Sequence, residues 1–186
     1  MKKVAINGLG RIGRLALRHY LLERPRHFEI VAANDLTPAD EMAYLIRYDS
    51  VHGRAPFPVA AGDGVLSFGD ASVKLSAEKD PSKLPWKSHG VDYVIECTGR
   101  FTKKEAASKH IEAGAKRVII SAPAGDADIT IVLGVNDAEY DPAKHVVVSN
   151  ASCTTNSIAP VIKVLDEAFG VRSEEHTSEL QSHHDL

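Results

Sequence analysis

The segment from Ser149 to Asn156, SNASCTTN, places a cysteine among small polar residues. An apolar run precedes the segment and apolar residues at helical spacing follow it, so we expect Cys153 at or near a helix start. The dipole at a helix start favours the thiolate, and backbone N–H groups of the turn can hold an oxyanion. Ser152 and Thr154 add hydroxyl groups suited to phosphate or carbonyl oxygens. These residues alone leave a nucleophile and a structural thiol equally open.

A second motif that could bind a ligand lies near the N-terminus. Gly8, Gly10 and Gly13 have the G-x-G-x-x-G spacing, and they follow an apolar run that ends at Asn7. Such glycines permit a tight turn, the approach of backbone to a pyrophosphate and the close packing of helix on strand. Asp35 ends the next apolar run, 22 residues after Gly13, where a carboxylate can bind ribose hydroxyls. Its charge would repel a 2′-phosphate, so the motif favours NAD over NADP; the alternative is a glycine turn without a nucleotide.

Two more polar loops follow expected strands. They are Cys97–Phe101 and Ser121–Pro123, and they fall where ligands of open α/β sheets bind. Either loop is equally compatible with a plain strand-to-helix turn. Cys97 ends an apolar strand, so we interpret it as a small apolar residue of the core.

The motifs lie in loops between strands and helices that are predicted to alternate along the chain. This alternation predicts the α/β class, with a Rossmann-type, mostly parallel sheet, helices on both faces and a small β-hairpin insertion. Thr37 is the expected N-cap of the second helix, with Pro38 at its first position and Met42, Ala43, Leu45 and Ile46 turned inward. We expect strands at 3–7, 29–34, 91–96, 117–121, 129–133 and 146–149, helices at 11–22, 103–113 and 154–169, and hairpin strands between 57 and 76.

Composition excludes several classes of function. With 44% apolar residues, 25% charged residues and a formal charge of −3, the chain gives no reason to expect a nucleic-acid groove or an anionic membrane partner. No apolar run reaches the roughly 18 residues of a membrane span, and the N-terminus does not read as a signal peptide. Two distant cysteines make no disulfide framework. We therefore expect a cytoplasmic protein with no nucleic-acid or membrane partner.

The composition changes after Val171. The tail RSEEHTSELQSHHDL holds three of the nine histidines, His176, His183 and His184. A metal site is conceivable there, but a solvated polar tail is favoured. The string resembles the translation of a sequencing-library adaptor, so we expect residues 172–186 to be a foreign or disordered tail and the authentic sequence to stop near Val171.

Over residues 1–171 the chain resembles the phosphorylating glyceraldehyde-3-phosphate dehydrogenase family. The resemblance implies an NAD-binding Rossmann domain at 1–150, and at 151–171 the start of a truncated catalytic domain that contains the nucleophile. The similar strings occur in the family's order: VAINGLGRIGR (4–14), NDL (34–36), YDSVHGR (48–54), AEKDP (77–81), ECTGRF (96–101), AGAKRVIISAPA (113–124) and SNASCTTN (149–156).

The resemblance also implies a reaction. Cys153 attacks the aldehyde of glyceraldehyde 3-phosphate, and the thiohemiacetal is oxidised by NAD to a thioester. Inorganic phosphate then releases 1,3-bisphosphoglycerate, with Ser152 and Thr154 binding substrate or phosphate. The family is homotetrameric. The implied cofactor-binding residues are Gly8, Gly10, Arg11, Ile12, Gly13, Asp35, Lys79, Thr98, Gly99 and Ser121.

The chain departs from the family pattern in a few places. Leu9 replaces a usual Phe, and Ser157 replaces a common second cysteine. The family's general-base histidine is not found after the nucleophile, so we expect no useful dehydrogenase activity from this chain. Two alternatives stay open. One is the related erythrose-4-phosphate dehydrogenase, which tends to carry Glu in place of Asp35, and the other is a non-catalytic NAD-binding fragment.

Overall fold

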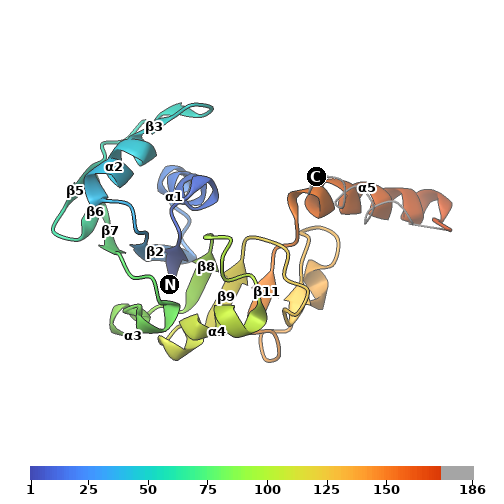
Figure 1. Ribbon diagram of the computed structural model, residues 1–186. Helices are drawn as coiled ribbons and strands as arrows, with labels where there is room; N and C mark the ends of the chain where they lie inside the picture. Colours follow the sequence, from blue (N-terminus) through green and yellow to red (C-terminus); the bar gives the residue numbers. More distant parts are fainter. Residues whose placement is uncertain (173–186) are drawn as a thin grey trace, which may run out of the picture.

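In the computed structural model, which describes residues 1–172, a nine-stranded sheet forms the centre of the chain (Figure 1). Its order is β10-β11-β9-β8-β1-β2-β7-β6-β5. The first seven strands are parallel, and β7, β6 and β5 pair antiparallel as the expected hairpin insertion. The predicted α/β class is thus confirmed. The bounds are β1 Lys2–Asn7, β2 Phe28–Asn34, β5 Ala60–Gly62, β6 Val65–Phe68, β7 Ala71–Ser76, β8 Tyr93–Glu96, β9 Arg117–Ile120, β10 Ile129–Thr130 and β11 Val147–Ser149.

Helices cover both faces of this sheet (Figure 1). Strand side chains alternate between the faces, so Val4 and Ile6 join the core under α1 and α2, whereas Ala5 joins the core that contains Trp86. A third apolar cluster packs α4 on β9 and β11. The helices are α1 Arg11–Glu23, α2 Ala39–Arg47, α3 Trp86–His89, α4 Lys104–Glu112 and α5 Cys153–Phe169, with 3-10 turns at Pro81–Lys83 and Asp137–Glu139.

The start of α2 differs from the prediction. Pro38 is its N-cap, and no side chain caps the helix. The backbone N–H of Thr37 instead donates to the Asp35 carboxylate at 2.9 Å, so Thr37 belongs to a turn anchored on Asp35. Leu45 was expected to point inward and is 36% exposed, because the buried face of α2 is formed by Met42, Ala43 and Ile46.

Other differences also have local causes. The strand expected over 129–133 is only two residues long, because the Asn136 side chain accepts from the Val132 N–H and donates to the Thr130 carbonyl. A two-stranded sheet, β3 Tyr48–Asp49 with β4 Gly53–Arg54, was not anticipated. The buried Arg18 of α1 holds this small sheet by donating to the Gly53 carbonyl at 3.0 Å.

Helix α5 projects from the sheet and buries none of its residues among those described (Figure 1). Asn156 ties its first turn to the Asn150 carbonyl, and Lys163 reaches the carbonyl of Gly134 at 2.8 Å. No helix in the described part of the chain is both long and apolar enough to cross a membrane. The expected foreign tail and its three histidines lie outside the described residues, apart from Arg172.

Candidate functional site

Six of the seven parallel strands, those from β11 to β7 in the sheet order, place the loops of interest in one row at their carboxyl ends. Hydrogen-bonded registry pairs the last residue of each strand with the last residue of its neighbour. Every loop that leaves this edge therefore starts at the same level of the sheet, where ligands of open α/β sheets bind. The row consists of Ser149 (β11), Ile120 (β9), Glu96 (β8), Asn7 (β1), Asn34 (β2) and Ser76 (β7).

The glycine-rich loop leaves the row at β1. Gly8 has φ of +90°, and a Cβ on Gly13 would lie 2.0 Å from the Gly8 carbonyl oxygen, so the backbone excludes side chains at both positions. A Cβ on Gly10 would meet no atom within 4 Å. Gly8 and Gly13 therefore serve the fold, whereas the surface at Gly10 is open for a ligand.

Helix α1 begins directly after this open surface. Gly10 is its N-cap, no side chain caps the helix, and its first turn contains no acidic residue. The first N–H groups of a helix lack intrahelical partners and lie at the positive end of its dipole. The exposed residues Arg11 and Ile12 form this first turn. The arrangement fits the pyrophosphate of a dinucleotide.

Asp35 binds the same loop from the end of β2. One of its carboxylate oxygens accepts the Leu9 N–H at 2.6 Å, and the other accepts the Thr37 N–H at 2.9 Å. The carboxylate is thereby held beside the glycine loop and is only partly buried. A half-exposed carboxylate in this position suits the hydroxyls of a ribose.

The loop after β8 packs directly on the glycine loop. A Cβ on Gly8 would lie 2.7 Å from the Thr98 methyl and 2.8 Å from the Thr98 nitrogen. Gly99, with φ of +70°, faces open space. Ser121 begins the next loop, and its N–H donates to the Glu96 carbonyl at 3.0 Å. Lys79 is exposed beyond β7 and, within residues 1–172, makes no hydrogen bond or ion pair to the glycine loop.

The turn that contains Cys153 leaves the row at β11. Ser152 caps α5 by accepting the Thr155 N–H at 3.0 Å, and its hydroxyl lies 2.8 Å from that of Thr154. Cys153 is the first residue of the helix, one residue earlier than the predicted start, and its side chain is exposed. The expected placement of Cys153 at a helix start is therefore confirmed.

Backbone strain marks the same turn. Ala151 is buried with φ of +58°, a region that costs a non-glycine residue about 1 kcal/mol or more. Ser149 holds it there, since the Ser149 hydroxyl accepts the Ala151 N–H at 3.1 Å and donates to the Ala122 carbonyl at 2.9 Å. The Asn156 amide donates to the carbonyls of Asn150 and Ser152.

The two cysteines have opposite environments. Burial raises the pKa of the Cys97 thiol to about 11, although a hydrogen bond with Ser121 partly opposes this shift. Cys153 is exposed at a helix start. The thiolate is the nucleophilic form, so the raised pKa disfavours reaction at Cys97 near neutral pH.

We therefore expect iodoacetamide at pH 8 to alkylate Cys153 and to spare Cys97, because a thiol with this pKa is only about one part in a thousand ionised at that pH. Mass spectrometry of tryptic peptides measures both sites. The unfolded chain in guanidinium is the control, in which both cysteines should react. Equal labelling of the two thiols in the native chain would contradict the assignment.

The structure joins some predicted residues and separates others. The glycine loop, Asp35 and Thr98 are in direct contact, and Ser121 adjoins them through β8. The turn of Cys153 starts three strand positions from β1, about 14 Å at normal strand spacing. A ligand that reaches both must be extended along the edge of the sheet.

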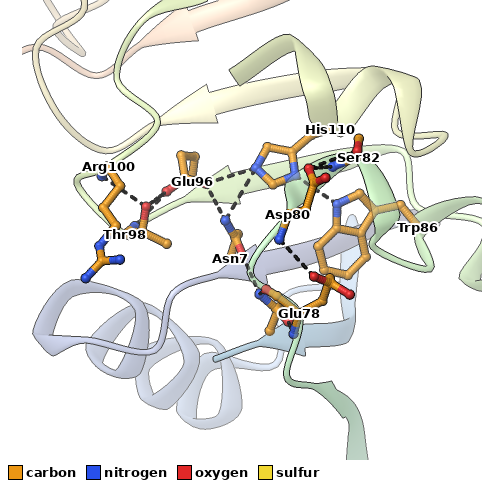
Figure 2. Close-up of polar contacts among 10 residues, drawn as sticks. Asn7, Glu78, Asp80, Ser82, Trp86, Glu96, Thr98, Arg100 and His110 are labelled. Atoms are coloured by element: carbon orange, nitrogen blue, oxygen red, sulfur yellow. Dashed lines mark hydrogen bonds and ion pairs between the residues drawn. The ribbon is translucent and has the colours of Figure 1, made fainter. Parts of the chain in front are cut away.

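A buried polar network beneath these loops was missed by the sequence analysis (Figure 2). Its members include Asn7, Asn34 and Glu96 of the row, together with His110 of α4 and Trp86 of α3. All except Trp86 are buried polar or charged residues. The polar residues that end these apolar strands were the available signal.

The sequence was compared with protein families and with curated proteins, and both comparisons identify the same family. Residues 2–104 match the family described as glyceraldehyde 3-phosphate dehydrogenase, NAD binding domain. The chain is 56% identical to the glyceraldehyde-3-phosphate dehydrogenase of Geobacillus stearothermophilus over 169 residues, which are 91% of this chain and 50% of that protein. It is 54% identical to the enzyme of Chlamydia pneumoniae over 170 residues, with 91% and 50% covered.

Glyceraldehyde-3-phosphate dehydrogenase 1 of Bacillus cereus is 52% identical over 172 residues, 92% of this chain and 51% of that protein. The chain thus spans about half the length of the curated relatives it matches. The open Gly10 surface, the uncapped start of α1 and the Asp35 carboxylate fit the cofactor that the family name specifies. The chain belongs to the glyceraldehyde 3-phosphate dehydrogenase family, through its NAD-binding domain.

Proposed function

We propose that this chain is the cofactor-binding part of a phosphorylating glyceraldehyde-3-phosphate dehydrogenase and also carries its nucleophile. Residues 1–150 would form the NAD domain, and residues 151–171 would begin the catalytic domain. The observation that carries the proposal is the shared edge of the sheet, which starts both the glycine loop and the turn of Cys153. The substrates are glyceraldehyde 3-phosphate and inorganic phosphate, and the full-length assembly is a homotetramer.

Each part of the edge has a proposed role in holding NAD. The N–H groups of Arg11, Ile12 and Gly13 bind the pyrophosphate over the open surface of Gly10, while Gly8 shapes the turn. Asp35 accepts the ribose hydroxyls. Lys79, Thr98, Gly99 and Ser121 line the remainder of the cofactor site. When bound, NAD supplies the hydride acceptor for aldehyde oxidation.

Covalent chemistry is assigned to the start of α5. The Cys153 thiolate attacks the aldehyde carbon, and backbone N–H groups of the turn stabilise the developing oxyanion. The hydroxyls of Ser152 and Thr154 bind the substrate or the attacking phosphate. The strained Ala151 holds this turn in a single shape because Ser149 and Asn156 brace it on both sides.

Calorimetry of the 186-residue chain tests the cofactor part of the proposal. We expect one NAD site per chain and weaker binding of NADP. No histidine of the described residues is hydrogen-bonded to Cys153, and loss of a general base typically costs about 10²–10⁴-fold in rate. NAD binding with little turnover of glyceraldehyde 3-phosphate is therefore the expected result. A chain that folds but does not bind NAD would overturn the proposal.

A further inference from the structure

The buried carboxylate of Glu96 lies between the two loops assigned to the cofactor. Glu96 is the last residue of β8 and is 1% exposed. One carboxylate oxygen accepts from the Asn7 amide at 2.6 Å and from the His110 ring at 2.9 Å. The other accepts the Thr98 N–H at 2.7 Å and also the Thr98 hydroxyl (Figure 2). Four donors therefore converge on one buried side chain.

Trp86 determines which ring nitrogen of His110 carries the proton. An indole N–H can only donate, and Trp86 Nε1 lies 3.0 Å from His110 Nδ1. Nδ1 must therefore accept, which leaves the ring proton on Nε2, directed at Glu96. His110 is fully buried and is held as the neutral tautomer that donates to the carboxylate.

Asn7 is oriented from the opposite side. The Glu78 N–H donates to Asn34 Oδ1 at 2.8 Å, and a backbone N–H cannot accept. Asn34 Nδ2 must then donate to Asn7 Oδ1, also at 2.8 Å. This order turns the Asn7 amide nitrogen toward Glu96. The series of hydrogen bonds from Trp86 through His110 and the series from Asn34 through Asn7 thus each end in a donor that points at Glu96. Every group that faces the Glu96 carboxylate therefore requires an acceptor.

An ionised carboxylate satisfies all four donors, whereas an uncharged amide of the same shape does not. In a Glu96→Gln variant, the new amide nitrogen would face either the pair Asn7 and His110 or the Thr98 N–H. In both cases at least two donors would meet in a buried place, which costs a hydrogen bond and leaves a polar group unpaired. The network is built for the anion itself.

Glu96 acts on the cofactor loops through Thr98. The Thr98 backbone packs against Gly8 so closely that a Cβ on Gly8 would lie 2.8 Å from the Thr98 nitrogen and 2.9 Å from its Cα. The other oxygen of Glu96 holds Asn7, which directly precedes Gly8. One carboxylate therefore sets the spacing of the glycine loop and the 98–100 loop.

We propose that Glu96 is a positioning residue for NAD, because its buried charge fixes Thr98 and Asn7 on either side of Gly8. The inference rests on the proposed binding of NAD. Supporting groups that hold a binding loop contribute to affinity without touching the ligand. Loss of the charge should then weaken NAD binding by more than its effect on folding explains.

The test compares Glu96→Gln with Trp86→Phe in the 186-residue chain. Trp86→Phe opens space in the same core and removes the donor to His110, but it leaves Glu96 bonded to Thr98. We expect both variants to lower Tm and only Glu96→Gln to raise the Kd for NAD, by about tenfold. Equal Kd changes in the two variants, or an unchanged Kd in a folded Glu96→Gln variant, would overturn the proposal.

Two measurements on the unsubstituted chain keep the test decisive if Glu96→Gln does not fold. Nitrogen-15 NMR should show His110 protonated on Nε2 only. Hydrogen exchange should show the Thr98 amide protected, although Thr98 lies outside the strand and is half-exposed. An unprotected Thr98 amide contradicts the positioning role, whereas absent NAD binding with a protected amide contradicts the proposed function alone.

Discussion

Gly13→Ala is expected to prevent the chain from reaching its native fold. The new Cβ would lie 2.0 Å from the Gly8 carbonyl oxygen and 3.2 Å from the Ile6 side chain. Neither group can move away from the new Cβ. The Ile6 side chain lies in the fully buried core, and the Gly8 N–H is hydrogen-bonded to the Asn34 carbonyl. Overpacking of this kind costs about 3 kcal/mol or more. Urea denaturation followed by circular dichroism measures the loss.

Gly10→Ala is the matched control in the same loop. A Cβ there meets no atom within 4 Å, and the Gly10 φ of −64° is available to any residue. The fold and Tm should therefore be unchanged. The added methyl group would occupy the surface that we assign to the pyrophosphate, so the Kd for NAD should rise at least about tenfold. A Gly13→Ala chain with native Tm, or a Gly10→Ala chain with native NAD affinity, would show that the two glycines are misassigned.

The second large effect concerns the choice of cofactor. Asp35→Ala removes the acceptor proposed for the ribose and frees the N–H of Leu9. Hydrogen bonds to a charged group contribute about 1.5–3 kcal/mol, so the Kd for NAD should rise by about 10- to 100-fold. The affinity for NADP should fall only slightly or should increase, because the charge that repels the 2′-phosphate of NADP is gone. The ratio of the two dissociation constants should approach one.

Asp40→Ala provides the control for charge. Asp40 is an exposed carboxylate in the first turn of α2, five residues from Asp35. Its removal changes the net charge by the same amount but leaves the bond to Leu9 intact. Calorimetric titration of both variants with NAD and NADP makes the comparison. If the Asp35→Ala variant still preferred NAD over NADP as strongly as the unsubstituted chain, the preference would have to come from another residue.

Much of the fold follows from short-range patterns. Apolar runs that alternate with amphipathic stretches predicted the α/β class and the approximate position of every long element. Two of the errors arose where a side chain bonded to nearby backbone. Asn136 shortened β10, and Asp35 drew Thr37 into a turn. Helix α3, four residues long, was missed because so short a segment has no periodicity.

By itself the sequence determined the parts of the site that are contiguous. The glycine spacing, the acidic residue that ends β2 and the start of α5 at Cys153 depend on near neighbours along the chain, and local propensity specifies them. The strain at Ala151 was not visible in the same way, because alanine does not favour a φ of +58°, and the Ser149 hydroxyl that accepts its N–H is a feature of the folded turn.

Only the tertiary structure decided how these parts combine. Asn7 and Glu96 are 89 residues apart, yet they are partners in register at the carboxyl edge. Their pairing requires the crossover connections of a parallel sheet, which no local pattern encodes. Thr98 against Gly8, and the donors gathered on Glu96, follow from that registry. The sequence therefore specifies the loops that are candidates for binding the cofactor, whereas packing of distant strands sets the distance between them.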